Sequence, residues 1–299
     1  MDHLYITPDD RLQKVFDAAA PGSVIHLAPG VYRQKAVIRT PRLTVIGAGA
    51  GKSRIVFDDY ARKRDEQGFE YITFRSYTLA VCADGVHMQD LSVINDALDP
   101  QVKGQEVALH VCGTDFSMTD CLLRSTQDTL FVGPLPQDLV ERYEGFLPDD
   151  FRRGAPMKQH FINCTIEGTL DFIFGCGEAL FENCCIRNVK EARKIGYVAA
   201  PAHSLEQEEG FTFHHCDFCC EDGVEPGSIY LARPWRDYGL ARFEGCSYGA
   251  HIAAAGFDKW NDTQRDRTAR FFEEPVVPGR VDWINRSEPT KNKQAREGT

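Results

Sequence analysis

The stretch HFINCTIEGTLDFIFGCGEALFENCCIRN, residues 160–188, contains one four-residue unit twice. Each copy has a polar residue, then a cysteine, a variable position and an apolar residue, at Asn163–Ile166 and again at Asn183–Ile186. The apolar runs around both copies are short, and Gly and Asn interrupt them. Short apolar runs bounded by turn residues, without helical periodicity between them, are typical of β-strands.

With a small residue also allowed at the first position and an apolar residue at the second, the same unit recurs elsewhere in the chain, starting at Asp90, Asp120, His215 and Gly245. Steps of roughly 20 to 40 residues between units indicate the coils of a solenoid, in which each coil buries its apolar face only against its neighbours. The sequence therefore predicts an all-β chain folded as a right-handed parallel β-helix. The rival all-β architecture, a sandwich or barrel, would show hairpin pairs joined by two-residue turns, and the sequence has few of them.

Two further segments complete the expected organisation. Apolar residues at helical spacing predict one short N-terminal helix within residues 9–19. Residues 132–159 are rich in Pro, Gly and charge, so we expect a long excursion from the solenoid there. We expect residues 1–286 to form a single β-helix domain and residues 287–299 to be a fraying polar tail.

Composition restricts the partners and the compartment. The chain has 299 residues, 42% hydrophobic residues and a formal net charge of -10, and it has no long basic run. This charge argues against nucleic acid or an anionic membrane as partner, and it means that an acidic substrate must be held locally or have its charge masked. No apolar stretch approaches the roughly twenty residues that span a bilayer. The eleven cysteines suit free thiols, so we expect a cytoplasmic protein, or a secreted one if the chain is a trimmed mature form.

Two segments place carboxylates where strands favour apolar side chains. They are STQDTLFVG, residues 125–133, with Asp128, and GTLDFIFG, residues 168–175, with Asp171. A lone aspartate in such a place most often caps a turn. In a parallel solenoid, however, residues of equal phase in successive coils stack about 4.8 Å apart, so distant positions can share one face.

Together with Gln105, Gln127 and Arg233, the two aspartates would form a complete catalytic set. A carboxylate kept ionised by a guanidinium can act as nucleophile or base, a protonated carboxyl can act as acid, and amides can hold a developing oxyanion. A pair of carboxylates would equally serve glycoside hydrolysis, so the residues alone leave both reactions open.

The sequence offers little support for a metal site or a serine nucleophile. Cys216 and Cys219 form a Cys-x-x-Cys pair, but no second pair with that spacing exists, so we expect no structural zinc. The Gly-x-Ser-x-Gly signature of serine hydrolases is also missing from the sequence.

Six segments in order from about Gly30 to Asn261 resemble the pectin methylesterase (pectinesterase) family: GVYRQKAVI, GQEVALHV, STQDTLFVG, QHFINCTIEGTLDFIFG, YLARPWRDYG and HIAAAGFDKWN. The long excursion is similar to that of some bacterial members. The resemblance implies a right-handed parallel β-helix and an enzyme that hydrolyses the methyl ester on C6 of galacturonosyl units, releasing methanol without a metal or organic cofactor.

Residue roles follow from the same resemblance. Asp171 corresponds to the nucleophile, Asp128 to the acid and later base, Gln127 and Gln105 to the oxyanion donors, and Arg233 to the partner that keeps Asp171 ionised. The resemblance also assigns the substrate groove to three aromatic residues: Trp235, Phe131 and Phe174. We expect Arg233 to lower the pKa of Asp171, and burial near Phe131 to raise that of Asp128.

The resemblance implies methylated pectin or oligogalacturonides as substrate, and we expect a monomer. One departure is Glu106, which stands where the family usually has Ala and adds negative charge near the cleft. Two rival functions remain: a glycosidase or lyase on the same β-helix, and a non-catalytic carbohydrate-binding solenoid in which the aspartates only cap turns.

Overall fold

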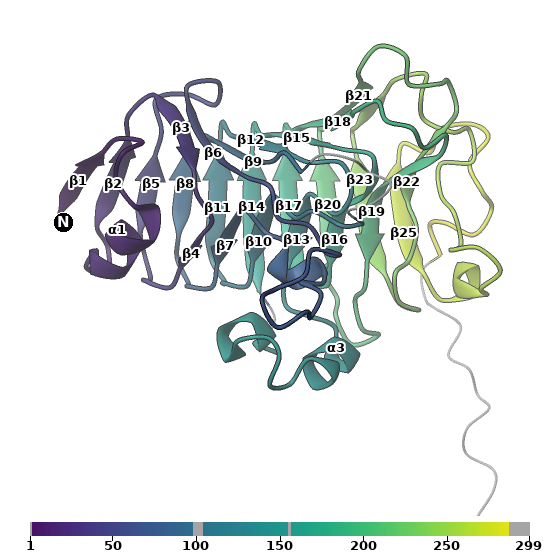
Figure 1. The fold of residues 1–299 in the computed structure, drawn as a ribbon. Coiled ribbons are helices and arrows are strands. Elements are labelled where there is room, and N and C mark those ends of the chain that lie inside the picture. The colour runs from purple at the N-terminus through teal and green to yellow at the C-terminus, as the bar shows by residue number, and fades with distance from the viewer. Residues whose placement is uncertain (1, 98–103, 155–156, 287–299) are drawn as a thin grey trace, which may run out of the picture.

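The chain winds as a right-handed parallel β-helix in a computed structural model that describes residues 2–97, 104–154 and 157–286. Three sheets run along the solenoid, and most coils contribute one strand to each (Figure 1). Every pairing between named strands in these ranges is parallel, for example Lys158 to Ile162 with Glu178 to Glu182. The predicted fold class is confirmed.

The strands fall into sheets of ten, eight and seven strands. The ten-stranded sheet contains β1 (His3–Ile6), β2 (Val24–Leu27), β5 (Thr44–Ile46), β8 (His87–Gln89), β11 (Phe116–Thr119), β14 (Lys158–Ile162), β17 (Glu178–Glu182), β20 (Phe211–His214), β23 (Leu240–Glu244) and β25 (Arg270–Glu274). The eight-stranded sheet contains β3 (Gly30–Arg33), β6 (Ser53–Phe57), β9 (Ser92–Asn95), β12 (Leu122–Arg124), β15 (Thr165–Gly168), β18 (Cys185–Asn188), β21 (Asp217–Cys220) and β24 (Ser247–Tyr248). The seven-stranded sheet contains β4 (Ala36–Ile38), β7 (Leu79–Val81), β10 (Leu109–Val111), β13 (Leu130–Val132), β16 (Leu170–Gly175), β19 (Gly196–Pro201) and β22 (Ile229–Ala232).

Helical segments are few in the described ranges. The helices are α1 (Leu12–Ala18) and α3 (Gln137–Arg142), with 3-10 turns η1 (Thr73–Arg75), η2 (Asp149–Arg152) and η3 (Arg265–Arg267). Helix α1 packs against β4 and buries Leu12 and Phe16 in the first coils of the core. The predicted short N-terminal helix is thereby confirmed.

The repeated unit marks the corner between the ten-stranded and the eight-stranded sheet. Its first residue has a positive φ each time: Asp90 (57°), Asp120 (53°), Asn163 (53°), Asn183 (52°), His215 (51°) and Gly245 (62°). Asn, Asp and Gly adopt this left-handed conformation at lower cost than most other residues, and they occupy five of these six corners, with His215 at the sixth.

The remaining residues of the unit build the core. The cysteine at the second position and the apolar residue at the fourth point inward, and Cys164, Ile166, Cys184 and Ile186 are at most 1% exposed. Beside them, aromatic rings from β14, β17, β20 and β23 stack in register, with centroids 5.0, 4.7 and 4.8 Å apart along the series Phe161, Phe181, Phe213 and Phe243. Each coil therefore buries its apolar side chains against those of the next coil.

All eleven cysteines are free thiols, as expected, and most of them are buried. Cys216 lies in the interior, 1% exposed, whereas Cys219 is half-buried with its Sγ 3.1 Å from the Sγ of Cys185. The two members of the Cys-x-x-Cys pair therefore do not converge on one site.

The segment predicted to leave the solenoid lies between Val132, which ends β13, and Lys158, which begins β14. Its described part contains α3 and η2. A second excursion, residues 58–78 between β6 and β7, was not predicted. The predicted polar tail, 287–299, lies outside the described residues.

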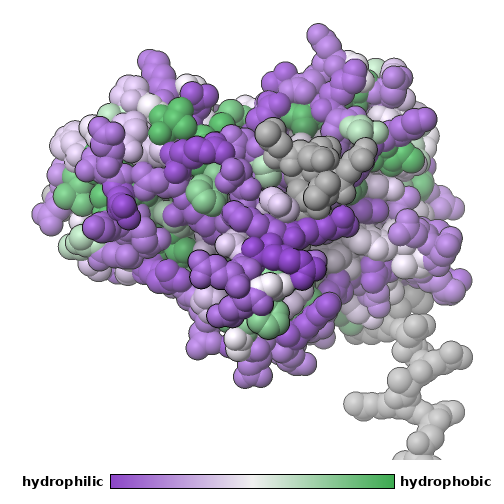
Figure 2. All heavy atoms as spheres, viewed as in Figure 1, coloured by the Kyte–Doolittle hydropathy of each residue, from purple (hydrophilic) through white to green (hydrophobic). Residues whose placement is uncertain are grey.

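The surface is mainly polar because most apolar side chains point into the solenoid. In Figure 2 the visible face is mainly hydrophilic, with small, separate hydrophobic areas. Large apolar side chains that are exposed in the described residues are dispersed along the chain: Tyr5, Val31, Phe69, Ile195 and Val276. Neither α1 nor α3 has the length and apolar character that a membrane-spanning helix requires.

The corner conformation gives a stability prediction. Asn183 is exposed and has a φ of 52°, so Asn183→Val should lower the free energy of unfolding by about 1–2 kcal/mol, because a β-branched residue is strained there. Asn183→Gly should stay within about 0.5 kcal/mol of the wild type. Urea unfolding of the three proteins tests this, and equal stability of the two variants would contradict it.

Candidate active site

Asp128 and Asp171 lie at neighbouring strands of the seven-stranded sheet. Asp128 lies two residues before the start of β13, Asp171 is the second residue of β16, and the backbone N–H of Asp128 donates to the carbonyl of Leu170 at 3.1 Å. Both aspartates have positive φ values, 66° and 49°, and the pairing of β16 with β19 shifts register just after Leu170. Such an irregularity re-aims side chains out of the normal alternation, which explains how carboxylates occupy these strands.

A bidentate ion pair fixes Asp171. Arg233 follows β22, and its Nε donates to Oδ1 of Asp171 at 2.8 Å while Nη2 donates to Oδ2 at 2.6 Å. The guanidinium lies between two aromatic rings, 3.8 Å from the Tyr197 centroid and 4.0 Å from that of Trp260. Both side chains of the pair are about nine-tenths buried, so the geometry of the carboxylate is strongly constrained.

Burial makes both carboxyl groups harder to ionise. The pKa of Asp128 is well above its usual range, chiefly because of burial, with further contributions from the negative charges of Asp171 and Glu106, and Arg193 and Arg233 oppose this rise. Burial also raises the pKa of Asp171, against the hydrogen bonds and charge of Arg233. Arg233 lowers the pKa of Asp171, as expected, but desolvation outweighs this effect, so the net shift is upward.

The two carboxyl groups nevertheless differ in how well their surroundings stabilise the anion. Asp171 has a cation bound at both oxygens, whereas no hydrogen-bond partner of the Asp128 carboxyl group is found in the described parts of the chain. Asp171 is thus the group better held as an anion, and Asp128 the group better held as a neutral acid.

Two glutamines supply amide donors beside the acids. The Oε1 atom of Gln127 accepts a hydrogen bond from Nη2 of Arg193 at 2.8 Å, so its amide N–H groups are the end left to donate. Gln105 lines the same cleft, and its backbone carbonyl accepts from the N–H of Ala61 at 2.8 Å. Both predicted oxyanion donors therefore lie in the cleft that contains the predicted acid.

The acids and amides open into a cleft of about 380 Å³. Its walls come from four parts of the chain: the turn at 73–74, the ends of the strands, the excursion with α3, and the segments after β22. The lining residues are Thr73, Phe74, Gln105, Gln127, Asp128, Leu139, Arg142, Tyr143, Asp171, Phe174, Ala200, Arg233, Trp235, Arg236 and Trp260.

The structure brings together seven of the eight predicted site residues and corrects the eighth. Phe174 and Trp235 line the cleft, with ring centroids 5.8 Å apart. Phe131, also predicted to line it, is fully buried beneath: its ring lies 4.5 Å from His110 and 5.3 Å from Phe74. Phe131 therefore supports the wall of the groove and has no surface to offer a substrate.

Glu106 is fully buried, with 0% exposure. It follows Gln105 in the chain and binds the backbone of Gln127, so it connects the two glutamines. Its Oε1 accepts from the backbone N–H groups of Thr126 at 3.0 Å and Gln127 at 3.4 Å, and from the Thr126 hydroxyl. In the sequence only its departure from the family pattern singled it out. Arg193, which orients Gln127, carried no such signal because it lies in an irregular segment far away in the sequence.

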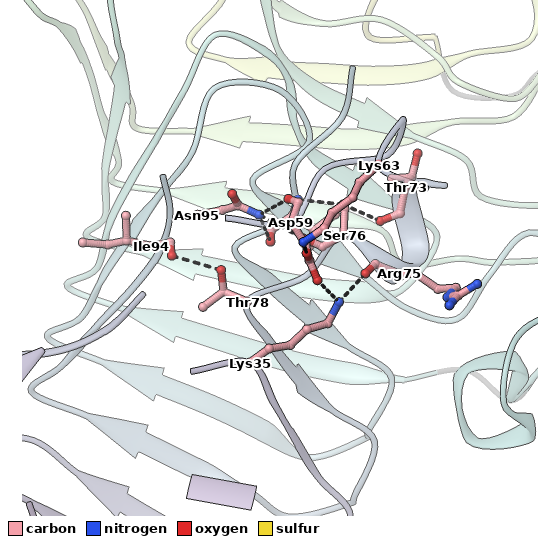
Figure 3. Close-up of polar contacts among 10 residues, drawn as sticks. Lys35, Asp59, Lys63, Thr73, Arg75, Ser76, Thr78, Ile94 and Asn95 are labelled. Atoms are coloured by element: carbon pink, nitrogen blue, oxygen red, sulfur yellow. Dashed lines mark hydrogen bonds and ion pairs between the residues drawn. The ribbon is translucent and has the colours of Figure 1, made fainter. Parts of the chain in front are cut away.

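A polar network ties the unpredicted excursion, residues 58–78, to the solenoid (Figure 3). The buried carboxylate of Asp59 binds Nζ of Lys35 at 2.6 Å and Nζ of Lys63 at 2.5 Å. The side-chain amide of Asn95 donates to the backbone carbonyls of Asp59 and Ser76 at 2.8 and 2.9 Å. Because the same segment binds the Gln105 carbonyl and carries the turn at 73–74, this network positions one wall of the site.

A family model for pectinesterases matches residues 4–138 and 153–295 of the chain. The chain belongs to the pectinesterase family. Among curated relatives, pectinesterase QRT1 of Arabidopsis thaliana is 28% identical over 278 residues, which cover 90% of this chain and 65% of that protein. Pectinesterase/pectinesterase inhibitor U1 of Solanum lycopersicum is 26% identical, with 99% of this chain and 48% of that protein covered. The pectinesterase chain thus spans about half to two thirds of the length of these two plant relatives.

Solved pectinesterase structures share the fold. The pectin methylesterase from carrot superimposes with a TM-score of 0.77 at 23% identity, covering 96% of this chain and 89% of that one. PemA from Erwinia chrysanthemi gives a TM-score of 0.76 at 23% identity, covering 94% and 92%. The family and the β-helix predicted from the sequence are both confirmed.

Removing the cation of the buried ion pair should destabilise the protein in a pH-dependent way. Arg233→Met leaves Asp171 buried and unpaired, so the free energy of unfolding should fall by roughly 3–5 kcal/mol at pH 7. Because the pKa of the folded-state carboxyl then rises further above its unfolded value, the loss should shrink as the pH falls to 4. Urea unfolding of the wild type and the variant at both pH values measures this loss in the free energy of unfolding.

The double variant Arg233→Met/Asp171→Asn is the control, since it removes the unpaired charge together with its partner. It should recover part of the stability at pH 7 and lose the pH dependence. An equal loss for the single variant at pH 4 and pH 7 would contradict this account.

Glu106→Gln should lower the pKa of Asp128, because it removes a nearby negative charge while an amide oxygen remains to accept from Thr126. A ¹³C NMR titration of the Asp128 carboxyl group in both proteins measures the change. Glu273→Gln, at another buried glutamate in β25, should leave that titration where it is. An unchanged pKa of Asp128 in Glu106→Gln would count against this electrostatic role.

Proposed function

We propose that the chain is a carboxylic ester hydrolase that removes methyl esters from galacturonosyl units of pectin or oligogalacturonides and releases methanol. One observation carries the proposal: a carboxylate fixed at both oxygens by Arg233 and a buried acid, Asp128, lie in one cleft with two amide donors. The relatives named above are pectinesterases, and one neighbouring structure is a pectin methylesterase in complex with a hexasaccharide.

In the first half of the proposed reaction, Asp171 attacks the ester carbonyl carbon. The electron pair of the C=O bond moves to oxygen, and the amide N–H groups of Gln127 and Gln105 stabilise that oxyanion. Methoxide is a poor leaving group, so the proton on Asp128 passes to it as the C–O bond breaks. Methanol leaves, and an anhydride joins Asp171 to the galacturonosyl carbonyl.

In the second half, Asp128 is an anion and takes a proton from water. The hydroxide equivalent attacks the anhydride, the same amides hold the second oxyanion, and the bond to Asp171 breaks. The free carboxylic acid leaves and loses its proton to solvent, giving galacturonate. Asp171 returns as a carboxylate, and Asp128 keeps the proton that it took from water. No metal or organic cofactor enters any step of this scheme.

The rigid pair between Asp171 and Arg233 makes the carboxylate an effective nucleophile. A carboxylate is weakly nucleophilic in water, but orientation and loss of hydration lower the barrier for its attack. Trp235, which is half-buried, offers an apolar face at the cleft for a sugar ring, and Phe174 packs against it.

Beyond the reaction, we propose a cytoplasmic monomer of the bacterial type. The eleven free thiols support a reducing compartment, and the dispersed exposed apolar side chains support a monomer. Residues 139–152, which the family model leaves unmatched, support the bacterial type because they fall within the long excursion.

The reaction is tested by methanol release from methylated oligogalacturonides. Asp128→Asn should reduce turnover by a factor of about 10² or more, and Asp171→Asn should bring it to background. Asp120→Asn, an isosteric change at a corner outside the cleft, is the control and should keep full activity. Methanol release without loss of polymer viscosity is expected.

The rival functions predict other outcomes. A glycosidase or lyase would lower the viscosity of pectin without methanol, and a carbohydrate-binding solenoid would bind it without turnover. Wild-type methanol release by Asp171→Asn would show that the nucleophile is assigned wrongly.

A further inference from the structure

Two cysteines from successive coils meet on the eight-stranded sheet, away from the cleft. Cys185 of β18 and Cys219 of β21 lie on neighbouring strands (Figure 1), and their Sγ atoms are 3.1 Å apart. The carboxylate of Asp217 completes a group in which the three ligand atoms lie within 4.8 Å of one another. Within residues 2–97, 104–154 and 157–286, no other group of three His, Cys, Asp or Glu side chains is as compact.

Strand register brings these side chains to one face. Cys185 is opposite Asp217, and Cys219 is two positions further along β21. Residues two apart on a strand point to the same side of the sheet. The residues that alternate with them, Ile186 and Phe218, are fully buried in the core. The two half-buried thiols and the exposed carboxylate therefore face outward, where an ion from solvent can reach them.

A buried histidine lies on the same face. The backbone N–H of Gly249 donates to the carbonyl of Phe218 at 2.9 Å, which continues the pairing of β24 with β21 and sets Gly249 opposite Cys219. A Cβ atom on Gly249 would lie 2.8 Å from Nδ1 of His251, so the imidazole occupies the space of a side chain next to Cys219. His251 is 2% exposed, and neither of its ring nitrogens has a hydrogen-bond partner in the described parts of the chain.

The unpartnered imidazole indicates a ligand. A buried polar group without a partner costs free energy, so it is rare in a folded protein unless a water or an ion binds it. Burial lowers the pKa of His251, and the charge of Asp217 opposes this fall, so the two groups lie within range of each other's charge. Imidazole, thiolate and carboxylate are the ligands that Zn²⁺ takes in proteins.

The spacing of the sulfur and oxygen atoms suits a tetrahedral ion. With Zn–S bonds of about 2.3 Å and Zn–O bonds of about 2.0 Å, the ligand atoms of such a site lie about 3.3–3.8 Å apart. The 3.1 Å between the sulfurs and the upper limit of 4.8 Å bracket this range, so small side-chain rotations bring all three atoms onto one ion. Asp217 is also oriented, because its Oδ1 accepts from Oγ of Ser247 at 2.5 Å and Oδ2 is left for the metal.

We propose that Cys185, Cys219 and Asp217 bind a thiophilic divalent cation such as Zn²⁺, with His251 as the fourth ligand. Binding replaces the two thiol protons, which pass to solvent. The Cys-x-x-Cys spacing does not reveal this site, because the two cysteines are 34 positions apart and converge only through the pairing of β18 with β21. The site is on a different sheet from the cleft, so it does not rest on the proposed function.

The ion would act as a cross-link of the solenoid. Its ligands come from β18, from β21 and from the segment after β24, which belong to three successive coils. An ion that binds only the folded chain stabilises it by mass action. At a free Zn²⁺ concentration about a hundredfold above Kd, the Tm of the reduced protein should rise by about 3–5 °C.

The first test is a titration of the metal-free, reduced protein with Co²⁺, whose bonds to thiolates absorb in the near ultraviolet. The wild type should bind one Co²⁺ per chain with this absorption, and Zn²⁺ should displace it. Cys219→Ser should bind at least about a hundredfold more weakly, because even groups that only orient a ligand contribute 10- to 100-fold to metal affinity. Cys220→Ser is the matched control, since it makes the same exchange at a half-buried thiol outside the group and should bind like the wild type.

The second test separates the other ligands and needs no spectroscopic signal from sulfur. Competition of Zn²⁺ with a chromophoric chelator should give affinities at least about tenfold weaker for His251→Ala and Asp217→Asn, and about tenfold weaker for Ser247→Ala. Thermal unfolding should show the Zn²⁺-dependent rise in Tm for Cys220→Ser and no rise for Cys219→Ser.

Three outcomes would overturn the proposal. One is a wild type that shows no thiolate absorption with excess Co²⁺. Another is wild-type affinity in Cys219→Ser or His251→Ala. The third is the loss of two thiols in a mild oxidant without any uptake of Zn²⁺ by the reduced protein, because Cys185 and Cys219 would then be a disulfide pair and not metal ligands.

Discussion

Parallel backbone pairing between successive coils is the constraint on which the site depends. β13 pairs with β16 from Leu130 and Ile173 onward, so two aspartates 43 positions apart in the chain come to adjacent strands. Neighbouring strands are held about 4.8 Å apart by their hydrogen bonds, a distance that side-chain packing cannot readily change. The solenoid thus fixes the spacing of the catalytic groups before any side-chain contact contributes.

The corner and the core could be predicted from the sequence because they follow a local rule. Each coil needs one residue that tolerates a positive φ and two inward side chains, and the unit at Asn163–Ile166 provides them within four positions. Asp128, Asp171 and Arg233 could be predicted from motifs for a related reason. Groups that contact the reacting atoms have the narrowest choice of residue type, and their positions leave a signal in the sequence.

Residues that support or orient other site residues were harder to predict from the sequence. Phe131 pairs in register with Phe174, so its phase in the strand is that of a groove residue. Phe74, on the unpredicted excursion 58–78, packs against Phe131 and covers it. The position of Phe131 in its strand cannot show that another segment buries it. Arg193 reaches Gln127 from 66 positions away in an irregular segment, so no periodicity could indicate that contact.

The net pKa shift of Asp171 could not be predicted from the sequence because it is a balance between two large effects. The contact with Arg233 can be inferred from a motif, but the loss of hydration depends on everything packed around the pair, including Tyr197 and Trp260. Burial raises the pKa of both acids, so the site depends on the difference between them. Arg233, bound at both oxygens of Asp171, provides that difference by stabilising one anion of the two.

The same reasoning applies to charge across the whole protein. A net charge of -10 and an anionic substrate appear incompatible only when charge is averaged over the surface. Within the cleft, the two paired arginines are neutralised by their own carboxylates, so the local field depends on the few groups left unpaired. The exposed pair of Arg236 with Asp138 contributes little to stability, but it decides which arginine at the cleft keeps a carboxylate partner.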